Sequence, residues 1–138
     1  LPLIQGGMGV GVSLSGLAGA VASEGGMGVI STAQIGFEEP DFVGNEEACN
    51  LRSIRKHIVR AKELASGKGM IAVNVMVALQ QYREHVKEAV RAGADAVICG
   101  AGLPVDLPDR VSRHILADTE RLVGIISRFL CGIALAVQ

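Results

Sequence analysis

The sequence predicts an α/β fold in which strands and helices alternate along the chain. Short apolar runs that fit buried strands alternate with segments whose apolar residues recur at helical spacing, and glycines stand at the joints between them. The connections are of helical length, which favours parallel strands. The chain has 138 residues, 49% of them hydrophobic and 20% charged, so it suits one ordered domain with a modest core.

The pentapeptide GGMGV occurs twice, at residues 6–10 and 25–29. Ser13 is expected to cap a helix between the copies, and Gly25 to end it in the left-handed conformation. The helix is indicated by apolar residues at helical spacing, namely Leu14, Leu17, Ala18, Val21 and Ala22. The first copy then ends a strand at residues 2–7, and the second leads into a strand at residues 28–33. These two kinds of loop lie at opposite ends of a sheet, so only the first is expected at the ligand-binding end.

The alternation continues to residue 99. Asn50 is expected to cap a second helix, closed by Gly67, whose apolar face carries Leu51, Ile54, Ile58, Ala61 and Ala65. A buried strand follows at Met70 to Val77, then a third helix that ends at Gly93 and a fourth strand at Asp95 to Cys99. Residues 36–49 form a longer acidic connection at the ligand-binding end.

Residues 109–138 form a separate tail in this interpretation. Asp118 is the expected cap of a helix whose apolar face carries Leu122, Ile125, Ile126, Phe129, Leu130 and Ile133. Arg128 lies in the middle of this stretch, and the uninterrupted apolar run is short, so a membrane span is not expected.

Asn74 is the most informative polar residue in the predicted strands. The β-branched residues of Met70 to Val77 occupy one face, and Ala72, Asn74 and Met76 occupy the other. If the β-branched face packs on helices, Asn74 points into a barrel interior, where an unpaired amide costs about 1 to 3 kcal/mol. Its side chain offers donors and an acceptor, which suits the edge of a heterocycle. The alternative is a buried asparagine that is satisfied by neighbouring backbone.

Charge and cysteine spacing exclude other classes. The net charge is -1 and no Lys/Arg run is interleaved with aromatic residues, so no nucleic-acid partner is expected. Cys49, Cys99 and Cys131 have no CxxC spacing, so we expect neither a disulfide framework nor a metal site, and we expect a cytoplasmic location.

Catalytic motifs are also missing from the pattern. The glycines match neither GxGxxG nor a Walker sequence. His57, His85 and His114 are interpreted as solvated. No paired carboxylates or nucleophile motif stands out, so the catalytic residues are unknown at this stage.

Three stretches resemble, in order and at suitable spacings, the amino-terminal part of the nitronate monooxygenase (2-nitropropane dioxygenase-like) family: PLIQGGMGVGVSLSGLAGAVASEGGMGVISTAQIGF, IAVNVMVA and EAVRAGADAVICGAGLPVDLP. Flavin-containing enoyl-ACP reductases are close relatives of that family. The resemblance covers roughly residues 1–108 and implies an FMN-binding (β/α)8 TIM barrel. A whole barrel takes about 250 residues, so this chain is expected to supply about the first four βα units. In the monooxygenases, alkyl nitronates are oxidised with O2 to a carbonyl compound and nitrite.

The resemblance also implies the cofactor-binding residues. The segment of Gly6, Gly7 and Met8 is similar to the family loop whose backbone lies against the flavin ring, and glycine lets a flat ring approach. Met8 offers a soft surface to that ring, and its alternative is a core residue. Asn74 matches the family's flavin-contacting asparagine, and the loop of Gly100 and Ala101 occupies the matching position after the fourth strand.

The tail at residues 109–138 departs from the family pattern, and no histidine here matches the family's catalytic Gly-Gly-His segment. Three alternatives stay open: an enoyl-ACP reductase-like enzyme, a non-catalytic truncated or frameshifted product, and a phosphate-binding barrel enzyme without flavin. The chain alone is expected to lack nitronate oxidation. It is also expected to self-associate through exposed edges of the first and fourth strands.

Overall fold

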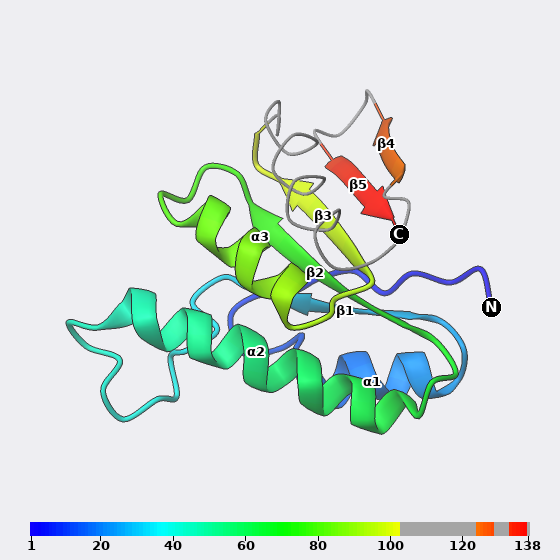
Figure 1. The fold of residues 1–138 in the computed structure, drawn as a ribbon, viewed down its shortest axis with the longest axis horizontal. Helices are drawn as coiled ribbons and strands as arrows, with labels where there is room; N and C mark the ends of the chain where they lie inside the picture. Colours follow the sequence, from blue (N-terminus) through cyan, green and yellow to red (C-terminus); the bar gives the residue numbers. More distant parts are fainter. Residues whose placement is uncertain (103–123, 129–132, 138) are drawn as a thin grey trace.

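The computed structural model describes residues 1–102, 124–128 and 133–137, which form an α/β fold with three helices and a five-stranded sheet (Figure 1). The elements, in chain order, are α1 Ser15–Ser23, β1 Met27–Ser31, α2 Glu46–Ala65, β2 Met70–Met76, α3 Tyr82–Arg91, β3 Ala96–Gly100, β4 Gly124–Arg128 and β5 Ile133–Val137. The strand order is β1-β2-β3-β5-β4.

The first three strands are parallel, as the helical crossovers predict. Ser31 of β1 pairs with Asn74 of β2, which pairs with Ile98 of β3. The predicted first strand at residues 2–7 is reduced to a parallel bridge between Ile4 and Met27. Two backbone hydrogen bonds support it, because the Met27 amide donates to the Leu3 carbonyl (2.8 Å) and the Met27 carbonyl accepts from the Gln5 amide (3.0 Å). The predicted order is therefore confirmed, although the first segment is too short to be a strand.

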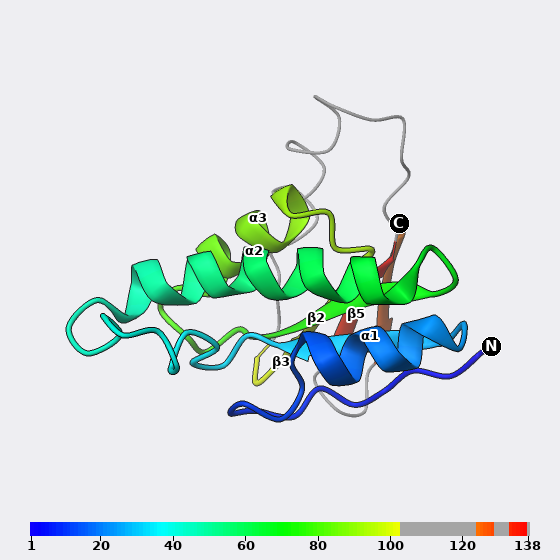
Figure 2. The same ribbon diagram turned by 90° about the horizontal axis from the view of Figure 1, so that it is seen from below.

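All three helices lie on one face of the parallel strands (Figure 2). Ile71, Val73 and Val75 of β2 belong to the core on this face. The core also contains Ala18, Ala22, Ile30, Ile35, Ile54, Ile58, Ala61, Ala65, Tyr82, Val86, Ala89, Ala94, Val97 and Cys99. Ala72 belongs instead to a smaller cluster on the opposite face, with Met27, Val29 and Ala96. The predicted alternation of β2 is confirmed, and it puts Asn74 on the face away from the helices.

The helix ends confirm one predicted cap and correct two. Gly25 has φ +84°, the left-handed conformation expected after α1. Ser13 is not the N-cap, because α1 begins one residue later, after Leu14. Asn50 is not a cap either: α2 begins at Glu46, and buried Asn50 accepts a hydrogen bond from the Gly36 amide (2.9 Å). The Asn50 side chain therefore holds the acidic connection against α2 and does not cap this helix.

The second GGMGV copy packs β1 against α1. A Cβ atom at Gly28 would overlap the backbone carbonyl of Ala18 in α1. Only glycine allows a helix and a strand to approach this closely. This copy therefore has a packing role, on the helix-covered side of the sheet.

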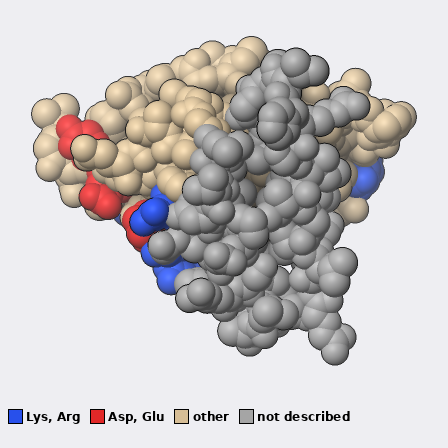
Figure 3. All heavy atoms as spheres, turned by 90° about the horizontal axis from the view of Figure 1, so that it is seen from above, with Lys and Arg blue, Asp and Glu red and all other residues tan. Residues whose placement is uncertain are grey.

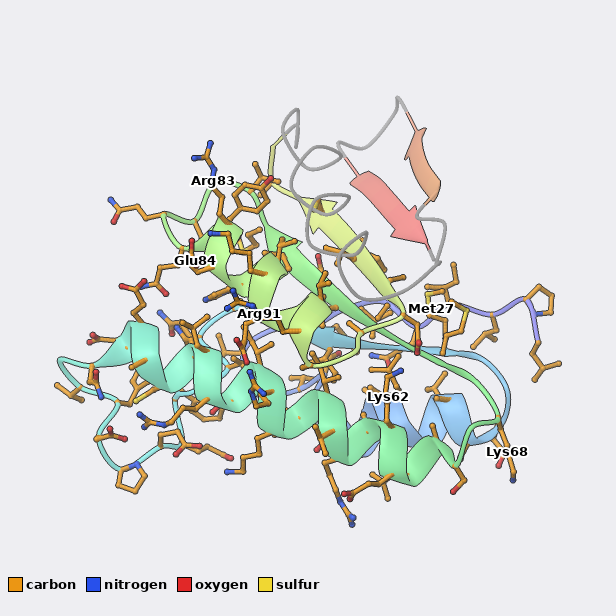
Figure 4. All side chains as sticks on the ribbon, viewed as in Figure 1. Met27, Lys62, Lys68, Arg83, Glu84 and Arg91 are labelled. Carbon is orange, nitrogen blue, oxygen red and sulfur yellow. The ribbon has the colours of Figure 1, made fainter. Side chains whose placement is uncertain are left out.

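An ion pair ties α2 to the edge of the sheet where β2 and β3 begin. One Asp95 carboxylate oxygen accepts from Lys62 Nζ (2.8 Å), and the other accepts from the Ile71 amide (2.8 Å). Lys62 is labelled on α2 in Figure 4, above the turn that contains Lys68. On α3, Glu84 lies in the first turn and Arg91 in the last, which complements the helix dipole (Figure 4).

The tail differs from the predicted helix. Gly124–Arg128 and Ile133–Val137 form antiparallel strands, β4 and β5. Isoleucines favour strands, and Gly132 is a poor helix residue, so local preference does not oppose this pairing. β5 pairs with β3, so the edge of the predicted fourth strand is covered rather than open. Asp118 and the predicted boundary after residue 108 lie outside the described residues.

Acidic and basic side chains lie next to one another at one end of the surface in Figure 3. Such mixed charge gives no extended basic patch on the described part of that face, in keeping with the net charge of -1. None of the helices that the structure describes is long and apolar enough to cross a membrane.

Candidate functional site

The first GGMGV copy forms a loop that is fixed by two polar side chains. Gln5 donates through Nε2 to Ser13 Oγ (2.9 Å) and accepts through Oε1 from the Val29 amide (3.2 Å). The fully buried Ser13 hydroxyl accepts in turn from the Met8 amide (2.9 Å). Neither residue was predicted to anchor the loop. A polar glutamine at the end of the apolar run LPLIQ was the signal available for Gln5.

The loop brings Gly7 directly against Asn74. A Cβ atom at Gly7 would lie 2.7 Å from Asn74 Cβ and 2.8 Å from Asn74 Nδ2. On the other side of Asn74, a Cβ at Gly100 would lie 3.9 Å from Asn74 Oδ1. Three of the six predicted cofactor-binding residues therefore meet on the face away from the helices.

The other three predicted residues surround this point less closely. Gly6 is exposed, and a Cβ built there would meet no atom within 4 Å. The Met8 side chain is 48% exposed, so it is not the core residue that was its alternative. Ala101 follows β3, is exposed and has φ +55°. Gly6 and Met8 thus leave open space beside the Gly7–Asn74 contact.

This arrangement has the features needed to hold the edge and face of a flat heterocycle. The half-buried Asn74 side-chain amide makes no hydrogen bond to residues 1–102, and it carries two donors and an acceptor. The backbone at Gly6 and Gly7 lacks side chains that would block a ring. The Met8 amide is already bonded to Ser13, so it is not available as a donor to the ring. The loop thus places bare glycine backbone beside a side-chain amide on the face away from the helices.

A cavity of about 520 Å³ lies near this loop, at the ends of β1 and β2 and between α2 and α3. None of the six predicted residues lines it. Its lining consists of Val10, Ala33, Gln34, Phe42, Glu46, Asn50, Met76, Leu79, Gln80, Gln81 and His85.

The prediction that the histidines are solvated is wrong for His85. Its side chain is 1% exposed, and burial lowers its pKa from 6.5 to about 4. His57 is half-buried, and its Nδ1 lies 3.0 Å from Ser15 Oγ; burial, with a contribution from Lys56, lowers its pKa. His114 lies outside the described residues. Charged neighbours in the sequence suggested solvent exposure, but His85 falls on the apolar stripe of α3 with Tyr82, Val86 and Ala89.

The carboxylates of the acidic connection are paired with α2. Asp41 bonds Arg52 (2.6 Å), and hydrogen bonds from Asn45 and Cys49 lower the pKa of Asp41. Glu39 accepts from Lys56 and Ser53, which lower its pKa. Within the described ranges, no group of three or more His, Cys, Asp or Glu residues is placed to hold a metal ion. These acids fix the connection to the helix.

The two described cysteines show no sign of reactivity. Cys49 and Cys99 are both fully buried. Burial raises the pKa of the Cys49 thiol, which keeps it protonated. Cys131 lies outside the part of the chain that the structure describes.

Comparison with known proteins adds no family assignment. The chain matches no protein-family model, and no curated protein matches it.

Proposed function

We propose that this chain provides the flavin-ring contacts of an FMN-dependent oxidoreductase of the nitronate monooxygenase type, built on a (β/α)8 barrel. The substrates would be an alkyl nitronate and O2. The observation that carries this proposal is the contact of Gly7 with Asn74 on the face away from the helices. The family motifs contain both residues, although these lie far apart in the sequence. Their contact agrees with the resemblance, which implies that both residues touch the same flavin.

Each residue has a defined part in the proposal. Gly6 and Gly7 bring bare backbone to the ring, Asn74 bonds the polar edge of the ring, and Met8 covers an apolar part. Gln5 and Ser13 hold the loop in place, so they are positioning residues. Bound FMN would supply the electron transfer between nitronate and oxygen. An enoyl-ACP reductase-like enzyme would use the same ring contacts, so flavin binding alone does not separate these two activities.

Replacement of Asn74 by alanine is expected to weaken FMN binding by about two- to tenfold, because one side-chain hydrogen bond is worth roughly 0.5 to 1.5 kcal/mol. The dissociation constant would be measured by quenching of FMN fluorescence with the 138-residue chain. Asn45→Ala is the matched control, since Asn45 precedes α2 and bonds Asp41 in the acidic connection. This control should bind FMN as the parent does. Equal affinity in Asn74→Ala and the parent would leave Asn74 with a structural role only, and no binding by the parent would refute the flavin proposal.

A further inference from the structure

His85 has one ring nitrogen with a partner and one without. Nδ1 lies 3.3 Å from the Thr32 hydroxyl oxygen. Nε2 is buried and has no hydrogen-bond partner in the described part of the chain. A buried polar atom without a partner costs about 1 to 3 kcal/mol, so this nitrogen needs an explanation.

The hydrogen bonds of Thr32 favour a proton on Nδ1 of the neutral His85 ring. Its hydroxyl has a single hydrogen and donates it to the Asn74 backbone carbonyl (3.1 Å). The Thr32 oxygen can then only accept from His85, so Nδ1 carries the proton of the neutral ring. Nε2 is therefore an unprotonated acceptor, and what it lacks is a donor. The low pKa of His85, about 4, keeps the ring neutral at physiological pH.

The cavity beside His85 combines an apolar wall with amide groups. Phe42, Met76 and Leu79 are among the apolar lining residues, and Gln34, Gln80 and Gln81 contribute amides. Among the described lining residues, only Glu46 and His85 are ionisable. Hydrogen bonds from backbone amides, including that of Gly44, lower the pKa of Glu46. A negative charge at the rim and the lack of a cation among the described lining residues disfavour anions. The nitronate anion therefore does not suit this cavity.

We propose that this cavity is a second binding site, for a small uncharged ligand whose apolar body packs on Phe42, Met76 and Leu79. His85 lines the cavity but its Nε2 is buried, so in this proposal a small movement of the ring lets an O–H or N–H group of the ligand donate to Nε2. The site is separate from the proposed flavin contacts, because none of Gly6, Gly7, Met8, Asn74, Gly100 and Ala101 lines it. Its volume of about 520 Å³ accommodates a ligand of the size of a substituted benzene ring.

Phenol and anisole test this site on the 138-residue chain, because they are similar in shape but only phenol donates a hydrogen bond. Dissociation constants would be obtained from shifts of the Gln34, Leu79 and Gln81 amide signals in NMR titrations. We expect phenol to bind roughly two- to tenfold more tightly than anisole, the worth of one neutral hydrogen bond. Benzoate should bind more weakly than phenol. His85→Phe should remove the preference for phenol, and His57→Phe, outside the cavity lining, should retain it.

The 15N shifts of the His85 ring provide a second measurement that needs no substitution. An unprotonated Nε2 that moves on addition of phenol, but not of anisole, would support the proposal. Equal affinities for phenol and anisole in the parent chain would overturn it, as would a protonated Nε2 or shifts confined to residues outside the cavity. These outcomes do not depend on FMN, so a failure of the flavin proposal remains distinguishable.

Discussion

Gly28→Ala is expected to lower the free energy of unfolding by about 3 kcal/mol, at the upper end of the cost of adding a methyl group to a close-packed core. The added Cβ would overlap the backbone carbonyl of Ala18, and backbone in the middle of α1 cannot rotate away as a side chain could. Relief requires a shift of α1 relative to β1, which would disturb the core around Ala18 and Ala22. Urea unfolding followed by circular dichroism measures the change.

Gly16→Ala is the matched control for Gly28→Ala. Gly16 lies in α1, is exposed, and a Cβ there would meet no atom within 4 Å. Alanine at this position should stabilise the protein by about 0.5 to 1 kcal/mol, since it lowers the entropy cost of forming the helix. If Gly28→Ala were as stable as the parent, the close packing of β1 on α1 would be wrong.

The second large effect is a loss of stability as the pH falls from 7.5 to 5. The folded-state pKa of His85 is about 4, below the ordinary value of 6.5, so the unfolded chain binds a proton in this range and the folded chain does not. Protonation thus favours unfolding, and the stability due to a neutral His85 declines below pH 6.5 and is lost by about pH 4. We expect a decrease of about 2 kcal/mol by pH 5, measured by urea unfolding at each pH.

Two comparisons isolate the contribution of His85. The pKa values of Glu39, Asp41 and Glu46 are also lowered by folding. These groups change the free energy of unfolding mainly below pH 5, since their ordinary pKa values are 4.5 or less. The pKa of His57 is also lowered, so its protonation favours unfolding as that of His85 does. His57→Phe should reduce the pH dependence of stability slightly, and His85→Phe should reduce it strongly. A parent chain whose stability is unchanged between pH 7.5 and pH 5 would contradict the burial of a neutral His85.

The sequence predicted features that depend on local pattern. The alternation in β2 put Val73 and Asn74 on opposite faces, because adjacent strand residues point in opposite directions. Gly25 was identified as a left-handed helix terminus because few other residues adopt that conformation. The closeness of Gly7 and Asn74 was predicted because parallel strands bring their carboxyl ends to one edge of the sheet.

Features that depend on tertiary partners were not predicted. Asn50 looks like a helix cap locally, but its role is set by the Gly36 amide, which only the folded chain brings close. Burial of His85 follows from the packing of α3 on the sheet, and its charged neighbours concealed it. The apolar residues of the tail have helical spacing, but the pairing of β5 with β3 overrides this local pattern.

In the proposed function the two GGMGV copies have different roles, and only the first contacts flavin. Titration of the 15N-labelled chain with FMN tests this directly, because the backbone amides of both copies are observed in one spectrum. We expect FMN to shift the Gly6 and Gly7 amides and the Asn74 side-chain amide, and to leave Gly26 and Gly28 unchanged. Equal shifts at both copies, or no shift at Gly7 and Asn74 with FMN in millimolar excess, would contradict the proposed site.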